Sequence, residues 1–273
     1  MRTLYSFSIS ILLMLLTANV HAQESFSTAI EDNSFFIEEA YNQETGIVQH
    51  ISNAFYFSKP SKDFSYSFTQ EWPVGSQTHQ LSYTIPYLSV ASGSAAGLSD
   101  IYVNYRYQLV SPEDHAYALS PRVSLILATG NQDKGLGNGV LGYQFNLPFS
   151  HRIAEQWVYH LNAGFTVLPS VKASLPTGEV KKNLLSYSAG GSLIWLATEK
   201  FNLMLEMLMN NSAEIGNNGT IERAAETIVN PGFRFAIDIG SLQIVPGVSL
   251  PVAFTNSLTR VGALGYVSFE HPL

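Results

Sequence analysis

Alternation of apolar and polar residues recurs along most of this chain, and it constrains the fold more than any other feature. In the stretch 101–109 the odd positions are Ile, Val, Tyr, Tyr and Leu, whereas the even positions are Tyr, Asn, Arg and Gln. Successive side chains of a strand point to opposite faces, so this stretch predicts a strand with one apolar and one polar face. About twelve such segments follow one another, joined by loops that alternate between short and long. The pattern predicts an all-β, single-chain transmembrane antiparallel β-barrel, with apolar faces toward lipid and polar faces toward a lumen.

The first residues have the character of an export leader. Arg2 supplies the positive charge, residues 7–16 form a short apolar run, and Val20-His21-Ala22 has the small residues of a cleavage site. The apolar run is too short for a membrane-spanning helix. We therefore expect a signal peptide at 1–22 that is removed, a short N-terminal periplasmic or lumen-inserted segment at 23–45, and an outer-membrane barrel at 46–273.

Composition narrows the possible functions. Charged residues make up 13% of the chain and aromatic residues 12%, whereas soluble domains average about 25% charged residues. The formal net charge of -7 without basic clusters argues against nucleic acid as a partner. Because the chain has no Cys, disulfides, thiolate metal sites and a lipoprotein anchor are excluded. The His residues show no metal-ligand spacing, so we expect neither a metal nor a cofactor.

Strand candidates can be marked by alternation and by the Gly, Pro, Asn and Asp clusters between them. They cover 46–58, 64–73, 77–87, 98–109, 115–128, 138–149, 155–168, 183–197, 199–211, 222–237, 240–253 and 260–270. Bacterial barrels have short periplasmic turns and long outer loops. Assigning the short links to the periplasm places both termini there. A secreted lipocalin-like or sandwich protein would alternate too, but with its apolar face inward.

A group of short motifs lies at 35–50, 71–72, 80–87, 97–101, 120–122, 127–131 and 137–148. Together these motifs resemble one bacterial envelope family, the outer-membrane proteins of the MetA pathway of phenol degradation. Ala128 and Ser99 depart from the residues expected in that family, which affects loop geometry rather than the fold. The resemblance implies a role in handling aromatic compounds by transport, and it assigns no functional residues.

His50 and Ser52 are the strongest enzymatic candidates in the sequence. Residues i and i+2 share a strand face, so His50 could act as a base beside Ser52, as in the outer-membrane phospholipase, another twelve-stranded barrel. A third polar group would have to orient the base, but Asn53 points to the opposite face. Ordinary polar strand residues are therefore the preferred interpretation, and we expect no catalytic residues. The GxGxxG pattern at 137–142 runs into a predicted strand rather than a helix, which argues against dinucleotide binding.

Charged and polar residues on the non-lipid faces form a second candidate set. An Arg on the lipid face near the midplane would cost about 2–4 kcal/mol, whereas inside it can pair with other residues or contact solute. The predicted lumen-lining residues are Arg106, Arg122, His160, Glu206, Glu226, Arg234 and Asp238. The alternative is that these groups only pair with one another to brace the wall.

The segment before the first strand is too polar on both faces to join a lipid-facing wall. Phe35, Phe36 and Ile37 nevertheless give it apolar side chains to bury. We expect it to enter the lumen as a small plug formed by Glu38, Glu39, Tyr41, Asn42 and Gln43. A loose periplasmic tail is the alternative.

These observations predict passive transport or binding of small solutes by a barrel of the Gram-negative outer membrane, with hydrophobic or aromatic solutes favoured by the resemblance alone. A barrel of twelve strands lies between those filled by side chains and those with an open aqueous channel. The expected partners are outer-membrane lipid, the barrel-assembly machinery and a small-molecule solute. A lipid-modifying enzyme and a purely structural barrel remain the alternatives.

Overall fold

A computed structural model of the chain of 273 residues describes residue 30 and residues 34–60, 62–113, 115–176, 178–240 and 242–273. The predicted leader at 1–22 lies outside the described residues. Almost all regular structure is β. The helices in the described part are two single 3-10 turns, η1 (Ala91–Gly93) and η2 (Gln132–Lys134). Neither is long and apolar enough to cross a membrane.

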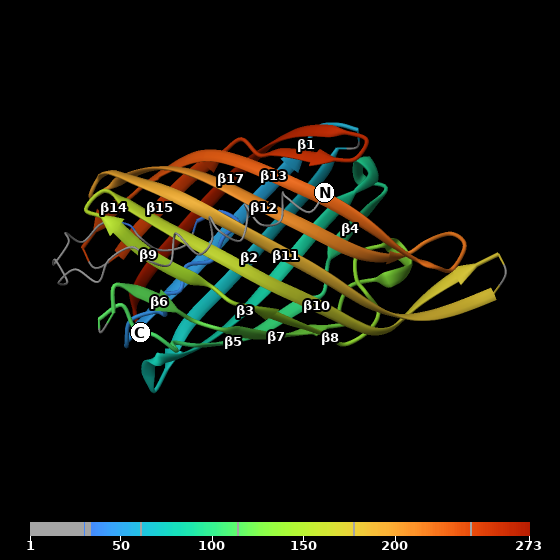
Figure 1. The fold of residues 1–273 in the computed structure, drawn as a ribbon, viewed down its shortest axis with the longest axis horizontal. Helices are drawn as coiled ribbons and strands as arrows, with labels where there is room; N and C mark the ends of the chain where they lie inside the picture. The colour runs from blue at the N-terminus through green and yellow to red at the C-terminus, as the bar shows by residue number, and fades with distance from the viewer. Residues whose placement is uncertain (1–29, 31–33, 61, 114, 177, 241) are drawn as a thin grey trace, which may run out of the picture.

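The strands form one antiparallel sheet that closes on itself (Figure 1). They are β1 (Ile47–Phe57), β2 (Asp63–Val74), β3 (Ser76–Val90), β4 (Ala95–Leu98), β5 (Ile101–Tyr107), β6 (Tyr117–Leu119), β7 (Arg122–Leu127), β8 (Gly142–Asn146), β9 (Phe149–Ala154), β10 (Trp157–Leu175), β11 (Gly178–Thr198), β12 (Phe201–Ile215), β13 (Ile221–Phe235), β14 (Ile237–Ile239), β15 (Leu242–Ser249), β16 (Val252–Thr255) and β17 (Thr259–Pro272). Pairing of β1 with β17 closes the barrel. The prediction of a single-chain antiparallel barrel of about twelve strands is confirmed.

Five barrel strands are each interrupted by a break, so that seventeen segments make a barrel of twelve strands. Proline causes three of the breaks, because it has no N–H to donate to the ladder. Pro121 separates β6 from β7, Pro148 separates β8 from β9, and Pro251 separates β15 from β16. The breaks leave the order of neighbours unchanged, so the wall stays continuous around the lumen.

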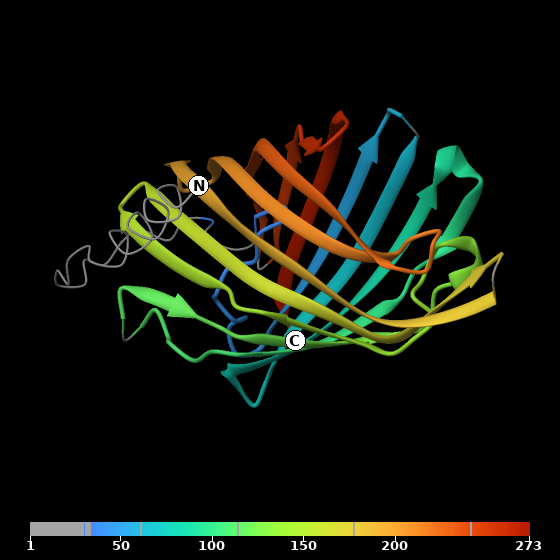
Figure 2. The ribbon, with the colours of Figure 1, turned by 45° about the vertical axis from the view of Figure 1, so that its right-hand side comes forward.

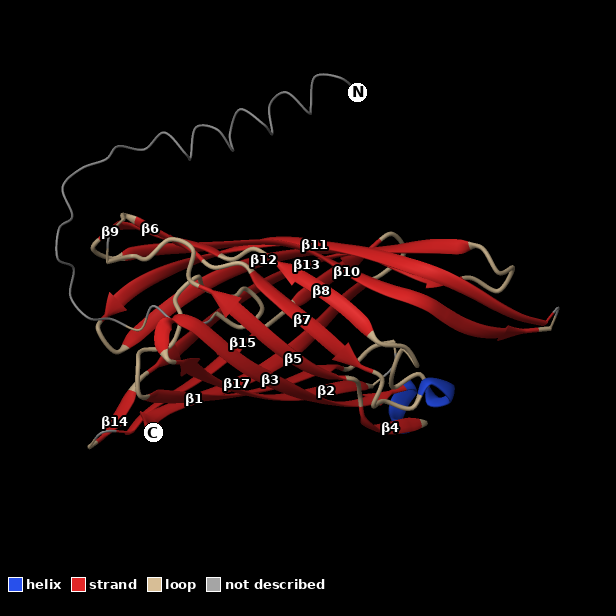
Figure 3. Ribbon diagram, turned by 90° about the horizontal axis from the view of Figure 1, so that it is seen from below, coloured by secondary structure: helices blue, strands red, loops and turns tan. Residues whose placement is uncertain are grey.

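The barrel has two different ends. At one end, called the terminal end here, the Leu273 N–H donates to the Gly46 carbonyl over 2.7 Å, so the C-terminus lies beside the start of β1. At the opposite, far end, both 3-10 turns lie beside β4, and the β10–β11 hairpin projects beyond the other strands (Figure 3). The chain therefore makes its longest excursions at the far end.

Strands extend into two of the predicted far-end loops. Residues 169–182 continue β10 and β11, and residues 212–215 continue β12. The ladder survives a register shift between Leu168 and Val171, where Ser170 adopts a positive φ of 57°. One extra residue in a left-handed conformation is typical of a β-bulge. Beyond the bulge, residues 171–175 still alternate, which keeps the hairpin paired.

Side chains divide between the two faces of the wall as the alternation predicts. Along β5, Val103, Tyr105 and Tyr107 are exposed on the outside, whereas Asn104 and Arg106 are buried inside. The outer surface exposes large apolar side chains on most strands, including Leu193, Leu203, Leu205, Met207, Met209, Phe233, Phe235, Val248 and Val267. In water these apolar groups would be unfavourable, so the outer surface suits a hydrocarbon environment.

The lumen has two unlike walls. The polar wall is the inner face of β2 to β9, and its members are Glu71, Gln80, Ser82, Asn104, Arg106, Gln108, Ser120, Arg122, Ser124, Gln144, Asn146 and Ser150. The apolar wall is the inner face of β10 to β17 and β1. Its apolar members are Ile51, Val158, Ile194, Leu196, Met204, Val245, Leu264 and Tyr266. Buried polar residues are also set into the apolar wall, among them His160, Ser192, Asn202, Glu206, Asn230 and Arg234.

Candidate functional site in the lumen

Residues 34–43, called the inner segment here, lie inside the barrel between the two walls. In Figure 2 this stretch is the dark blue irregular trace inside the barrel. Ile30, the nearest described residue before this segment, is buried, and its carbonyl accepts hydrogen bonds from Asn202 Nδ2 at 2.6 Å and from Arg234 at 3.2 Å. The chain then passes through the lumen and leaves at the terminal end, where β1 begins.

Apolar side chains of the inner segment pack on the apolar wall. Phe35 is 6% exposed and meets Tyr266 edge-to-face, with ring centroids 5.6 Å apart. Glycines make room for them: a Cβ at Gly247 would lie 2.8 Å from the Phe35 ring, and one at Gly190 would lie 2.6 Å from Ile37. A barrel wall with larger residues at these positions would exclude the inner segment.

Glu206 is the main polar contact of the inner segment on the apolar wall. Its Oε1 accepts the backbone N–H groups of Phe36 at 2.9 Å and Ile37 at 3.1 Å, and its Oε2 accepts from Asn230 at 2.6 Å. Buried polar groups are costly unless they are hydrogen-bonded. Glu206 therefore satisfies two backbone donors of a segment that has no strand partner.

The polar wall and its boundary with β10 satisfy the remaining backbone of the inner segment. Asn162 exchanges two hydrogen bonds with the backbone of Glu38, at 2.9 and 2.7 Å. The Ala40 N–H donates to Ser150 Oγ, and its carbonyl accepts from Ser120 and Gln108, each at 2.7 Å. These neutral side chains make the hydrogen bonds that a neighbouring strand would make to the backbone of the segment.

Arg106 lies at the centre of the largest charged cluster. Its guanidinium donates to Asn42 Oδ1 at 2.9 Å and to the Tyr41 carbonyl at 2.7 Å. It forms ion pairs with Glu39 at 3.3 Å and with Glu71 at 3.9 Å. The Arg106 and Glu39 side chains are 3% and 1% exposed. This pair is sealed from solvent, which makes it a structural anchor.

Arg122 forms a second, more open ion pair with Glu38. Two hydrogen bonds of 2.7 and 2.9 Å join the guanidinium to the two carboxylate oxygens. The side chains of Arg122 and Glu38 are 13% and 30% exposed. The other partners of Arg122 are the uncharged groups of Asn104, Ser124 and Gln144. Burial raises the pKa of the Glu38 carboxyl, but the charges of Arg122 and Arg106 outweigh it and hold that pKa below its usual range.

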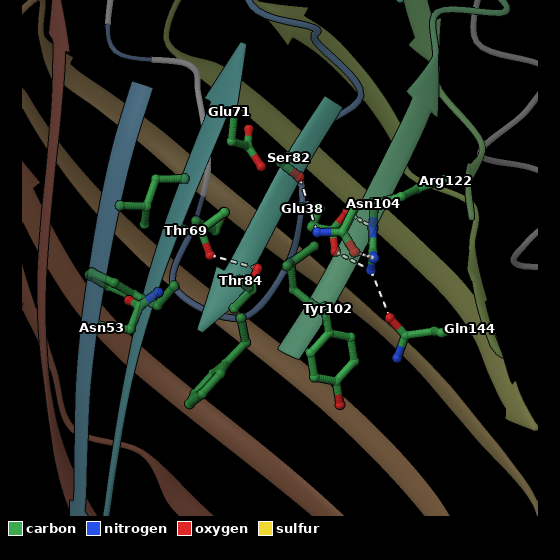
Figure 4. A pocket seen from close by; sticks show the side chains of 15 residues that line it. Glu38, Asn53, Thr69, Glu71, Ser82, Thr84, Tyr102, Asn104, Arg122 and Gln144 are labelled. Atoms are coloured by element: carbon green, nitrogen blue, oxygen red, sulfur yellow. Dashed lines mark hydrogen bonds and ion pairs between the residues drawn. The ribbon is translucent and has the colours of Figure 1, made fainter. Parts of the chain in front are cut away.

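A cavity of about 250 Å³ lies against this ion pair (Figure 4). Phe35, Phe36, Ile37 and Ile51 supply apolar lining on one side. The other side is polar and consists of Glu38, Asn53, Thr69, Glu71, Ser82, Thr84, Tyr102, Asn104, Arg122 and Gln144. Thr84 and Tyr102 are paired neighbours farther from the terminal end than Gln80 and Arg106. The cavity therefore lies on the far-end side of the inner segment.

The other predicted lumen residues occupy different positions. His160 is fully buried, with Nδ1 2.7 Å from Ser150 Oγ, and its ring meets that of Tyr41 edge-to-face. Glu226 pairs with Arg260 at 2.5 Å, outside the cavity lining. The placement of Asp238 differs from the prediction: it is exposed on β14 and pairs with Lys200 at 2.9 Å. The reason is that the wall breaks at Ala236 and β14 belongs to the hairpin at the terminal end.

His50 and Ser52 do not form a catalytic arrangement. The His50 ring stacks on Phe269 and lies 3.2 Å from His271 Nε2, while Ser52 Oγ bonds to the Tyr66 hydroxyl at 3.0 Å. Within the described ranges, no group of three His, Cys, Asp or Glu side chains could hold a metal ion. The glycine-rich stretch at 137–142 leads into β8, which is a strand rather than a nucleotide-binding helix.

Sequence reasoning missed several residues that hold the inner segment. Glu71, Gln80, Gln108, Ser150 and Asn162 all contact it or its arginine partners. Each occupies a polar position of an alternating strand, and this signal was present in the sequence. Four of these five residues are neutral, and neutral side chains provide most of the hydrogen bonds to the backbone of the segment.

The sequence matches no protein-family model and no curated protein. Among solved structures, the fold is similar to an outer membrane channel from Pseudomonas putida F1, with a TM-score of 0.67 and 13% sequence identity. The match covers 86% of this chain and 98% of that one. The NanC porin matches with a TM-score of 0.53 and 9% identity, over 82% of this chain and 100% of that one. The fold is thus that of outer-membrane β-barrels.

Proposed function

We propose that this chain is an outer-membrane channel for passive transport or binding of small solutes, with both termini in the periplasm. The observation that carries the proposal is the cavity at the far end of the lumen, which is closed on the terminal side by the inner segment. An apolar outer face and a polar inner face are the arrangement expected of a barrel in lipid. Two proteins that share the fold are described as a channel and a porin.

We further propose that the solutes are hydrophobic or aromatic and that the chain is related to the MetA-pathway family. The sequence motifs described above support this assignment, and so does the chemistry of the cavity. Phe35, Phe36 and Ile51 give one side an apolar surface, while hydroxyl and amide groups line the opposite side. An amphipathic cavity suits a solute with an apolar body and a polar group.

The plug role of Glu38, Glu39, Tyr41, Asn42 and Gln43 is part of this proposal. Ordering a segment costs about 1–2 kcal/mol of backbone entropy per residue, so a free tail would not remain inside the lumen. Hydrogen bonds to the wall offset this entropy cost. Arg106, Arg122 and Gln108 donate to the inner segment, and Glu206 accepts from it. Passage would then require at least partial displacement of this segment.

Liposome swelling with a graded series of small sugars tests the transport role. Deletion of residues 34–43 should raise the swelling rate and the single-channel conductance several-fold, because the segment fills the lumen. Glu226→Gln is a matched control, because this lumen carboxylate lies outside the cavity lining. Heat-dependent migration on gels would establish that each variant has assembled. Unchanged swelling by an assembled deletion variant would contradict the channel function and would favour a structural barrel.

A further inference from the structure

Glu38 occupies a site on Arg122 that a free carboxylate could occupy equally well. The carboxylate binds the guanidinium through both oxygens at 2.7 and 2.9 Å, which is the bidentate geometry that Arg favours for carboxylate ligands. The pair borders the cavity, and 30% of the Glu38 side chain remains exposed. Resting on the channel function proposed above, we propose that the cavity binds small apolar monocarboxylates whose carboxylate displaces Glu38 from Arg122.

The preorganisation of Arg122 supports an anion site. Asn104 Oδ1 and Gln144 Oε1 each accept from the guanidinium at 3.0 Å, and Ser124 makes a further contact. These groups fix the orientation of the guanidinium without neutralising its charge. Within the described part of the chain, the carboxylate in contact with Arg122 is that of Glu38. Exchange with a solute carboxylate would therefore keep Arg122 paired with one carboxylate, while the displaced Glu38 would turn toward solvent.

The contrast with Arg106 identifies which of the two arginines can exchange its partner. The Arg106 side chain is 3% exposed and pairs with Glu71 of the wall and Glu39 of the inner segment. It also donates to the backbone carbonyls of Glu39 and Tyr41. A solute could reach it only after the segment had left. Among the described residues, Arg122 contacts the segment through two hydrogen bonds to the Glu38 side chain. Displacing Glu38 thus breaks two hydrogen bonds and leaves the Arg106 anchor intact.

The size and lining of the cavity define the solute class. A volume of about 250 Å³ lies below the roughly 300–1,000 Å³ of sites for drug-sized ligands, so a single ring or a short chain fits. Phe35, Phe36 and Ile37 lie beside Glu38 in sequence and line the same cavity. A carboxylate on Arg122 would therefore place its apolar body against these side chains. The same body would contact the part of the segment that packs on the apolar wall.

Calorimetry on the full mature protein in detergent tests this inference, with benzoate as the probe and benzyl alcohol as its neutral counterpart. Glu38→Gln removes the competing charge and should raise benzoate affinity roughly tenfold, the effect of a charge-assisted pair. Arg122→Gln should lower benzoate affinity by a similar factor. Benzyl alcohol should bind all variants within about twofold, since a neutral group gains little from a guanidinium. Glu226→Gln serves as the control at the other lumen ion pair and should leave both affinities unchanged.

Conductance provides a second measurement that separates displacement from simple binding. Benzoate should raise the conductance of the unmodified protein and should have no such effect on Arg122→Gln. Equal binding of benzoate and benzyl alcohol, or benzoate affinity unaltered by Glu38→Gln, would overturn the inference. If sugars still crossed the liposome membrane in that case, the channel function would stand and only the carboxylate site would fall. Because Glu38 lies outside the wall, its variant tests the idea even if Arg122→Gln fails to assemble.

Discussion

The two walls of the lumen hold the same ten-residue segment by different physical means. The polar wall binds it through directed bonds, such as those of Arg106 to Asn42 and Tyr41. The apolar wall combines hydrogen bonds of Glu206 to two backbone N–H groups with glycines that accommodate Phe35 and Ile37. Directed bonds fix the position of a chain atom by atom, whereas apolar contact depends on area and fit. Directed bonds therefore dominate on the polar wall, whereas the apolar wall adds packing to them.

This contrast predicts that removing the charge of Arg106 on the polar wall lowers stability more than removing the Phe35 ring, which packs on the apolar wall. Arg106→Gln should reduce the free energy of unfolding by about 3–5 kcal/mol, because the buried Glu39 and Glu71 carboxylates lose their cationic partner. Urea unfolding in lipid vesicles measures the change. Conductance should rise as well, since Asn42 and Tyr41 lose their anchor.

Arg223→Gln is a matched control for that experiment. Arg223 is exposed near the far end, where it donates to Asn211 and lies over the Tyr187 ring. Even exposed ion pairs contribute only about 0–1 kcal/mol, so the loss of this exposed side chain, which contacts an amide and a ring, should have little effect on stability. Equal effects of the two substitutions would mean that the polar wall does not anchor the segment.

The apolar wall can be tested by a double-mutant cycle between Phe35 and Gly247. Phe35→Ala should cost about 3 kcal/mol by leaving a cavity against Tyr266. Gly247→Ala should be unfavourable in the natural chain, because its Cβ would lie 2.8 Å from the Phe35 ring. In the Phe35→Ala background the same change should cost less, giving a coupling of at least about 0.5 kcal/mol.

Gly265→Ala is the control for this cycle, since a Cβ there meets nothing within 4 Å. It should be nearly neutral in both backgrounds. Strict additivity between Phe35 and Gly247 would show that the ring does not rest on this glycine in the membrane. The apolar wall would then contribute area without any specific fit.

The sequence was sufficient to predict the strands of the barrel wall and their two faces, but not which residues pair inside the lumen. Alternation alone indicates which face of β5 carries Arg106, because a strand has a fixed period of two. The pairing of Glu39 with Arg106 and of Glu38 with Arg122 depends on the path of an irregular segment through the lumen. No periodicity encodes such a path. Asp238 differs from the prediction for a related reason, because alternation does not show where a strand passes the end of the lumen, and β14 is exposed throughout.

The smallest expected effect concerns the ion pair between Arg122 and Glu38 and its dependence on pH. The pKa of Glu38 is lowered from an ordinary value of 4.5, so the folded state favours the charged carboxylate. Its contribution is therefore complete above pH 4.5 and is lost as the pH falls through the lowered pKa. A partly exposed pair of this kind contributes about 1 kcal/mol. Conductance of the unmodified protein should rise in acid as the segment loosens.

Glu38→Gln isolates this contribution from the other carboxylates of the lumen. The variant should show slightly higher conductance at neutral pH and a smaller rise on acidification, because Gln cannot gain a proton. Every other carboxylate is present in both proteins, so the difference between the two pH profiles reports the contribution of the Glu38 charge. Identical profiles would mean that the bidentate pair with Arg122 does not hold the segment. The polar wall would then act through Arg106 and the neutral side chains, and Glu38 would be free to exchange at no cost to the plug.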